Sequence, residues 1–388
     1  MMPALTVIIP VYNTQAYLEK CVSSVLNQTL TNIEILCIDD CSIDNSPAIL
    51  RSLQARDARI RIVRHERNLG LGEVRNTGIR LASAPYLASV DSDDYIAPDM
   101  LEILYRAAME DDHDIVACGW ADVDENERVL GTASFEDRVV DLRNCPADMD
   151  ILNIVNPSFC MKLWRRALFI ENDIFFPSDM YYEDLATTPR LLLKAKDIRF
   201  VEGDYYRYLL RGGSIMNTLS AKHAFDYFHV FDILKEFLLA EDIFLRHEAS
   251  FDLLVTKHLS YYAGKIAGLD VDLRKKQQYL KYLVLLAEAY GKSDAQYRRH
   301  DIDQLRSAIM EGAGSDGSSP ADDADADTDH ARLVQPEWYS RSPVRFVPSP
   351  LLPVMAAVAG RCGDVFRHEA LRQLSRRLAS VQILNKRP

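Results

Sequence analysis

The first 120 residues alternate short, continuously apolar runs with segments whose apolar residues recur every three or four positions. Continuous β-branched runs are typical of strands buried on both faces of a parallel sheet. The segments between them place their apolar residues on one face of a helix. We therefore predict strands at about 5–9, 33–38, 60–63, 86–90 and 114–118, and helices at about 14–26, 45–55, 71–82 and 98–109.

This alternation predicts an α/β fold with a mostly parallel central sheet and helices on both of its faces. Sheets of this kind bind ligands at the carboxyl ends of their strands. Two acidic clusters, Asp39-Asp40 and Asp91-Ser92-Asp93-Asp94, directly follow predicted strands. We therefore expect a ligand site at this edge of the sheet.

The pattern changes further along the chain. Residues 120–215 are irregular, with short strands such as 198–201, and a helical pattern extends from Ala221 to about Ile309. Residues 312–332 are small and acidic with almost no apolar bulk, which is typical of a disordered linker. We expect four parts: an α/β domain at 1–216, a helical extension at 217–311, the linker at 312–332 and a basic segment at 333–388.

The formal net charge of −12 over 388 residues is unevenly distributed. Residues 331–388 hold ten Lys and Arg and three Asp and Glu, a net of +7, so the rest of the chain holds −19. This negative balance argues against a nucleic-acid partner. Because the seven cysteines form no C-x-x-C pair, and because no secretory signal or bilayer-length apolar run is present, we expect a cytoplasmic protein with reduced thiols.

The basic tail has two interpretations. Leu371, Leu374, Leu378 and Val381 repeat at helical spacing, with arginines on the other faces. A helix over 364–384 could lie on an anionic membrane, as a peripheral contact on the inner face of the cytoplasmic membrane. Alternatively it packs against the main body or against a second subunit of a homo-oligomer.

If the chain binds a nucleotide, it has to neutralise the charge of the phosphates. A glycine-rich loop is one way to do this, and the chain has no such loop. No G-x-x-x-x-G-K-[ST] motif is present, and Arg75 stands where G-x-G-x-x-G requires its third glycine. Asp91 and Asp93 offer the other solution, since two carboxylates leaving a strand can converge on a cation such as Mn²⁺ or Mg²⁺. The alternative interpretation is an ordinary turn before Pro98.

Ordered motifs make the pattern specific. They are Val7 to Asn13, Ser24 to Thr29, Ile38 to Asp44, Asn68 to Gly70, Arg75 to Gly78, Val90 to Asp94, Lys162 to Arg165, Tyr182 to Asp184 and Arg211 to Ile215. Over about residues 4–216 this series resembles an inverting family 2 glycosyltransferase of GT-A fold, an enzyme of the hexosyltransferase type. Cys41 departs from the family pattern, which usually has a small residue there, often glycine.

The resemblance implies a nucleotide-base pocket lined by Pro10 and Tyr12. Tyr12 would stack on a uracil-type ring, and Asp40, rather than Asp39, would accept a hydrogen bond from the base. A carboxylate suits this role because it can accept from a ring N–H.

The resemblance also implies that Asp91-Ser92-Asp93 is the D-x-D motif. Asp91 and Asp93 would contact the ribose and the diphosphate bound to Mn²⁺ or Mg²⁺, with Ser92 between them in the donor site. Arg75 and Asn76 have two interpretations: they orient these carboxylates, or they cap and pack the helix to which they belong.

Inverting transfer needs a carboxylate to take the proton of the attacking hydroxyl. The resemblance places Asp184 at the general base, with Glu183 beside it. Both precede a predicted helix at 185–193, and a helix N-terminus should lower the pKa of Asp184. Trp164 has two interpretations, a stacking platform for the sugar or acceptor and a core aromatic residue.

These features predict a metal-dependent inverting glycosyltransferase. It would transfer a sugar from a nucleotide-sugar, with a UDP-sugar expected, to a glycan or lipid-linked acceptor in surface-polysaccharide or glycoconjugate biosynthesis. One alternative is a sugar-phosphate nucleotidyltransferase, which usually has a glycine-rich basic loop near its first strand. Another is a non-catalytic nucleotide-sugar-binding protein, against which the acids at 40, 91, 93 and 184 argue.

Overall fold

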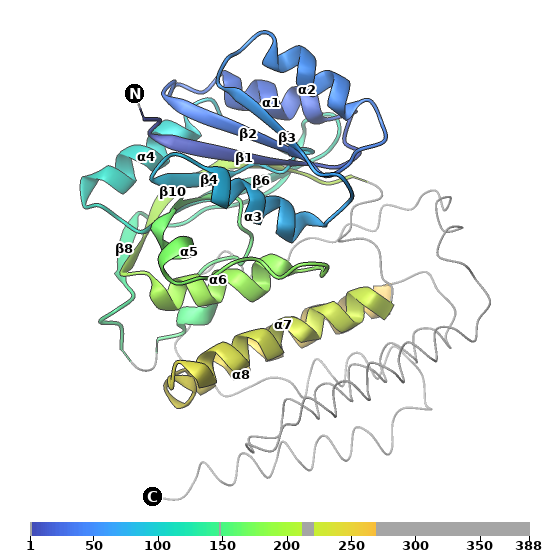
Figure 1. Ribbon diagram of the computed structural model, residues 1–388. Coiled ribbons are helices and arrows are strands. Elements are labelled where there is room, and N and C mark those ends of the chain that lie inside the picture. Colours follow the sequence, from blue (N-terminus) through green and yellow to red (C-terminus); the bar gives the residue numbers. More distant parts are fainter. Residues whose placement is uncertain (1, 147–148, 212–220, 269–388) are drawn as a thin grey trace, which may run out of the picture. The chain divides into compact units, whose positions relative to one another are not determined.

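A computed structural model describes residues 2–146, 149–211 and 221–268 (Figure 1). The linker and the basic segment expected beyond residue 311 lie outside these residues, as do the helices expected between 273 and 309. The described residues fall into two compact units: one holds those up to 211 together with 229–250, and the other holds 221–228 and 251–268. Among these residues, no helix is long and apolar enough to cross a membrane.

The amino-terminal half of the sheet is parallel, as predicted. Strands β1 (Leu5–Val11), β2 (Ile33–Asp39), β3 (Ile60–Arg64) and β4 (Tyr86–Ser89) lie in the order β3-β2-β1-β4. Each pair of neighbours is parallel. The helices that link or follow these strands are α1 (Leu18–Leu26), α2 (Ser46–Gln54), α3 (Leu71–Leu81) and α4 (Met100–Glu110).

The second half of the sheet is mixed. The sheet continues from β4 through β9 (Lys162–Arg165), β6 (Ile115–Val123) and β10 (Asp197–Leu209) to β5 (Tyr95–Ile96). β9 is antiparallel to both of its neighbours, whereas β6 and β10 are parallel to each other. The short strands β7 (Val129–Ala133) and β8 (Arg138–Asp141) pair antiparallel with β6 and β10.

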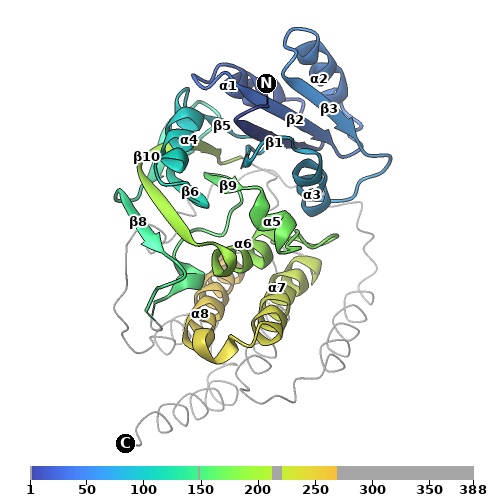
Figure 2. The same ribbon diagram turned by 60° about the vertical axis from the view of Figure 1, so that its left-hand side comes forward.

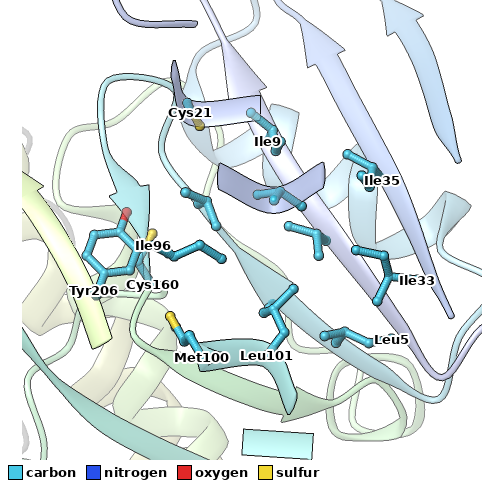
Figure 3. Packing of buried hydrophobic residues seen from close by; sticks show 14 of the residues in the cluster. Leu5, Ile9, Cys21, Ile33, Ile35, Ile96, Met100, Leu101, Cys160 and Tyr206 are labelled. Atoms are coloured by element: carbon cyan, nitrogen blue, oxygen red, sulfur yellow. The ribbon is translucent and has the colours of Figure 1, made fainter. Parts of the chain in front are cut away.

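Helices cover both faces of the parallel strands, as predicted (Figures 1 and 2). Alternate residues of β1, such as Leu5 and Ile9, enter a core cluster with Cys21 of α1 and Leu101 of α4 (Figure 3). Ile8 points to the opposite face, where it packs so tightly on α3 that a Cβ atom at Gly78 would clash with it. This close approach of helix and strand fixes the position of α3, the helix on which Arg75 lies.

The remaining helices follow the irregular segment that the sequence pattern indicated. They are the 3₁₀ helix η1 (Ile151–Asn153), α5 (Ala167–Glu171), α6 (Glu183–Lys194), α7 (Ala221–Ala240) and α8 (Phe244–Gly268). In the first unit, the apolar stripe of α7 is buried at Phe231, Leu234 and Leu238. In the second unit, the Tyr227 hydroxyl lies 2.6 Å from Nδ1 of His258, and burial lowers the pKa of His258 to about 3.

Candidate active site

The ends of two adjacent strands, β1 and β2, carry the first predicted site residues. Pro10 is buried in β1, and Tyr12 follows that strand with 48% of its surface exposed. Asp40 follows β2, which is parallel to β1 and in register with it up to Asp39 opposite Val11. Because parallel strands end at the same edge, Tyr12 and Asp40 lie at the same edge of the sheet, where a ligand site was predicted.

The loop after β2 is bound to the loop after β1. The backbone N–H of Asn13 donates to Oγ of Ser42 at 3.1 Å, and Ile43 donates to Oδ1 of Asn13 at 2.9 Å. Directly before Ser42 and Ile43, Cys41 has a φ of 63°, in the left-handed region that favours glycine. This backbone conformation explains why the family pattern usually has a small residue where this chain has Cys41.

The Asp40 carboxylate is buried and accepts three hydrogen bonds from the segment after β3. Oδ1 accepts from the backbone N–H of Leu69 at 2.9 Å and lies 2.7 Å from Nδ1 of His65. Oδ2 accepts from the backbone N–H of Gly70 at 2.9 Å. The carboxylate therefore organises the Asn68-Leu69-Gly70 turn.

The D-x-D segment leaves β4 with its outer carboxylates partly open to solvent. The side chains of Asp91 and Asp93 are 29% and 27% exposed. Ser92 lies between them and is buried, and its Oγ accepts a hydrogen bond from Oγ1 of Thr14 at 3.0 Å. Asp93 forms an ion pair with Arg211, whose Nη2 lies 2.8 Å from Oδ2.

Asp94, the last acid of this cluster, has a different role from the first two. It is fully buried, accepts a hydrogen bond from the Tyr206 hydroxyl at 2.7 Å, and accepts another from the backbone N–H of Leu209 at 2.8 Å. Burial raises its pKa well above the ordinary value, and the charges of Asp93 and Asp91 raise it further. Asp94 therefore joins the D-x-D loop to β10 instead of facing the donor.

Asp91 and Asp93 fit a divalent cation in one respect that the structure shows. Burial raises the pKa of Asp93, and the neighbouring Asp91 charge raises it further, so a cation between them would relieve that repulsion. Within the described residues no three His, Cys, Asp or Glu side chains gather around a common point. Two carboxylates still suit Mg²⁺ or Mn²⁺, since such ions commonly complete their coordination with substrate phosphates and water.

Arg75 joins the D-x-D segment to Glu183, the neighbour of the predicted base Asp184. The guanidinium is buried, with Nη1 donating to Oε1 of Glu183 and Nη2 donating to Oδ1 of Asp91 at 3.1 Å. It also lies over the rings of Phe159 and Phe176, 5.6 Å from each centroid. Burial acts to lower the pKa of Arg75, but Asp91 and Glu183 together raise it above the ordinary value.

Asn76, the neighbour of Arg75, does not contact the D-x-D carboxylates. Its side chain donates to the carbonyl of Phe176 at 2.8 Å and accepts from the N–H of the same residue at 2.9 Å. It also donates to Glu73 at 3.1 Å. Of the two interpretations for this pair of residues, Arg75 therefore orients carboxylates, whereas Asn76 packs α3 against the segment before α6.

Glu183 and Asp184 begin α6, directly after Tyr182, whose φ of 61° turns the chain into the helix. The backbone N–H of Leu185 donates to Oδ1 of Asp184 at 2.8 Å. Burial raises the pKa of Glu183 to about 7 and also raises that of Asp184. The prediction that the helix N-terminus lowers the pKa of Asp184 is therefore wrong. Arg75 and the Leu185 N–H both lower this pKa, but burial outweighs them.

Trp164 does not face the site. The side chain is 0% exposed, its Nε1 donates to the carbonyl of Phe159 at 3.0 Å, and the ring packs against Phe159 and Phe169. The interpretation of Trp164 as a platform for the sugar or acceptor is therefore wrong, and the core interpretation holds. The reason is that β9, the strand of Trp164, lies inside the sheet between β4 and β6.

Sequence reasoning gave no role to three residues that the structure places in this network. Arg211 contacts Asp93 and His65 contacts Asp40, while the buried Nζ of Lys162 donates to the carbonyls of Asn156 and Ser158 at 2.8 and 2.6 Å. Arg211 and Lys162 belong to motifs that resemble the family, and this membership is the sequence feature that could have identified them. Their partners are set by the fold.

Comparison with known proteins identifies the family. The sequence model of glycosyl transferase family 2 matches residues 6–172. The glycosyltransferase GlyG of Streptococcus pneumoniae is 34% identical over 233 residues, which are 56% of this chain and 74% of GlyG. A poly(ribitol-phosphate) beta-glucosyltransferase of Bacillus spizizenii is 32% identical over 219 residues, 55% of this chain and 33% of that enzyme. The chain belongs to glycosyl transferase family 2.

The fold is also found among solved structures. Residues 1–349 of S. aureus TarS in complex with UDP give a TM-score of 0.58 at 22% identity, covering 80% of this chain and 91% of that one. The same fragment in complex with UDP-GlcNAc gives 0.50, also at 22% identity, covering 80% and 92%. This likeness confirms the predicted GT-A type architecture.

The buried position of Arg75 generates a prediction about stability. Arg75→Met leaves the Glu183 carboxylate buried without its cation, and we expect a loss of about 3–5 kcal/mol in the free energy of unfolding. In the Glu183→Gln background the same substitution should cost much less. Urea unfolding of the two single variants and the double variant gives the coupling.

The control is the exposed ion pair between Lys20 and Glu127, whose side chains are 45% and 62% exposed. Lys20→Met should cost no more than about 1 kcal/mol. Additive effects of the Arg75 and Glu183 substitutions would contradict the proposed coupling.

Proposed function

We propose that this chain is a metal-dependent inverting glycosyltransferase that transfers a sugar from a UDP-sugar to a glycan or lipid-linked acceptor, in the assembly of a surface polysaccharide or glycoconjugate. The observation behind this proposal is the link that Arg75 makes between Asp91 and Glu183. Through it, carboxylates suited to a diphosphate-bound cation and a carboxylate pair suited to proton transfer share one edge of the sheet.

The donor half of the site supports a nucleotide diphosphate. An exposed Tyr12 ring offers a stacking surface, and the buried Asp40 carboxylate offers an acceptor for a ring N–H. TarS, which has the same fold, has been solved with UDP and with UDP-GlcNAc. Asp91 and Asp93 would hold Mn²⁺ or Mg²⁺, which when bound supplies charge stabilisation for the departing diphosphate.

The acid pair supports a single-displacement reaction. An acceptor hydroxyl attacks the anomeric carbon from the face opposite UDP, a new C–O bond forms, and the bond to the diphosphate oxygen breaks. The proton of the hydroxyl passes to Asp184, and UDP leaves with the bonding electron pair. Asp184 is the better candidate for the base because Arg75 holds Oε1 of Glu183 in an ion pair.

The acceptor class rests on the relatives. One of them is named for glucosyl transfer to poly(ribitol phosphate), a polyol phosphate polymer. A glycan or a lipid-linked acceptor is therefore the class we propose for this chain.

A donor panel tests the proposal against its alternatives. The full chain is incubated with UDP-sugars and Mn²⁺, and the released products are identified. We expect UDP release with one donor, and a loss of about 10²–10⁴-fold in the rate for Asp184→Asn. UDP affinity should stay unchanged, since Asp184 contacts the acceptor proton and not the nucleotide.

Asp173→Asn is the matched control. Asp173 is an exposed acid with a φ of 51°, a conformation that asparagine also adopts readily. The rate of the Asp173→Asn variant should therefore equal that of the wild type. Release of inorganic diphosphate would instead establish a nucleotidyltransferase, and UDP-sugar binding without turnover would establish a non-catalytic protein.

Metal dependence gives a second prediction. Asp93→Ala removes one of the two carboxylates proposed to hold the cation, so UDP binding in Mn²⁺ should weaken by at least about tenfold. In EDTA, Asp93→Ala should bind UDP as tightly as the wild type does. Isothermal titration in both buffers measures this, and an equal loss in EDTA would contradict a metal role for Asp93.

The raised pKa values predict the pH dependence. A general base works only when deprotonated, so kcat should fall as the pH decreases through its pKa. Because burial raises the pKa of Asp184, this fall should occur above the ordinary value of about 4. Glu183→Gln removes a neighbouring negative charge and should move the fall to lower pH. A midpoint near 4 in the wild type would count against Asp184 as the buried base.

A further inference from the structure

His65 makes the Asp40 carboxylate part of a fixed network. The side chains of His65 and Asp40 are only 9% and 4% exposed, and Nδ1 of His65 lies 2.7 Å from Oδ1 of Asp40. On the other side of the ring, Nε2 of His65 lies 3.0 Å from Oγ1 of Thr77. Thr77 belongs to α3, so the imidazole connects the carboxylate to a helix that is packed on the sheet.

The chemistry of the partners assigns the protons. An ionised carboxylate has no hydrogen to donate, so Nδ1–H of His65 is the donor to Oδ1 of Asp40. In the neutral imidazole Nε2 is then an acceptor, which matches the hydroxyl of Thr77 as its donor. Both ring nitrogens are occupied, which fixes the orientation of the ring and of the carboxylate that it contacts.

The lone pairs of Asp40 are nearly used up by the protein itself. A carboxylate has about four acceptor positions, two on each oxygen. His65 Nδ1–H and the Leu69 N–H fill both positions on Oδ1, and the Gly70 N–H fills one on Oδ2. One acceptor position on Oδ2 remains for a ligand.

A single remaining acceptor distinguishes nucleobases. Uracil presents one ring N–H, which one acceptor satisfies. Guanine presents a ring N–H and an adjacent exocyclic amino group, and both need acceptors when they are taken out of water. With Oδ1 occupied, Asp40 can serve only one of these two donors.

We infer that His65 is a specificity-determining residue: by filling Oδ1 of Asp40, it restricts the base site to one acceptor and so favours UDP over GDP. This inference rests on the proposed function, in which Asp40 accepts from the base. His65 acts through Asp40 and is therefore a positioning residue. Its signature is the ratio of the two affinities, which a general loss of fold would not change.

The experiment measures the dissociation constants of UDP and GDP in Mn²⁺ for the full chain. Wild type should prefer UDP. His65→Ala frees a position on Oδ1, and we expect the preference for UDP over GDP to shrink by about tenfold. His65→Asn retains an N–H donor near the position of Nδ1 and should keep most of the preference.

The fold offers a matched control. His113 forms the same kind of pair, with Nδ1 lying 3.0 Å from Oδ2 of Asp197, and its side chain is 3% exposed. These residues precede β6 and begin β10, at the opposite ends of the strands from the nucleotide edge. His113→Ala should leave the ratio of the UDP and GDP affinities unchanged, even where it lowers stability.

The outcomes separate the inference from the proposed function. If wild type binds UDP and GDP equally, or if His65→Ala keeps the wild-type ratio, the inference is wrong while a nucleotide-sugar transferase remains. If the wild type binds no nucleotide, the proposed function fails and the inference fails with it. The inference is supported if His65→Ala has a smaller preference for UDP over GDP than the wild type and His65→Asn keeps most of the wild-type preference.

Discussion

The site depends on one buried cation between two acids. Arg75 lies in α3, Asp91 follows β4 and Glu183 begins α6, so the ion pairs form only when all three elements are in place. A buried charge without a partner costs several kcal/mol, so the buried Arg75 and Glu183 side chains each depend on the other. The same guanidinium therefore holds the D-x-D segment next to Glu183, the residue before the proposed base Asp184.

The other acids at this edge, Asp93 and Asp94, are also held by partners from a distant part of the chain. Asp93 is paired with Arg211, and Asp94 accepts from Tyr206. Each of these partners lies in or directly beyond β10, more than 100 residues further along the chain. In the proposed function, these carboxylates hold positions from which a cation would bridge to the phosphates, so an acidic protein could bind an anionic diphosphate.

Local pattern predicted the parallel half of the fold well, because buried strands and amphipathic helices leave their periodicity in the sequence. It did not predict that β9 would run antiparallel between β4 and β6, since strand direction depends on how the irregular segment before Lys162 returns to the sheet. The placement of β9 in turn decided that Trp164 is a core residue. An aromatic residue next to arginines has no local feature that tells a buried ring from an exposed one.

The sequence by itself determined which chemical groups the site contains: acids directly after strands, an aromatic residue after the first strand, and an acid pair at a helix start. Covalent order suffices for this, because strand ends and helix starts are local. Only the tertiary structure decided what each group does. It gave Asn76 a packing role, raised the pKa of Asp184 by burying it, and placed His65 against Asp40. Desolvation and lone-pair occupancy depend on neighbours that the fold brings from distant parts of the chain.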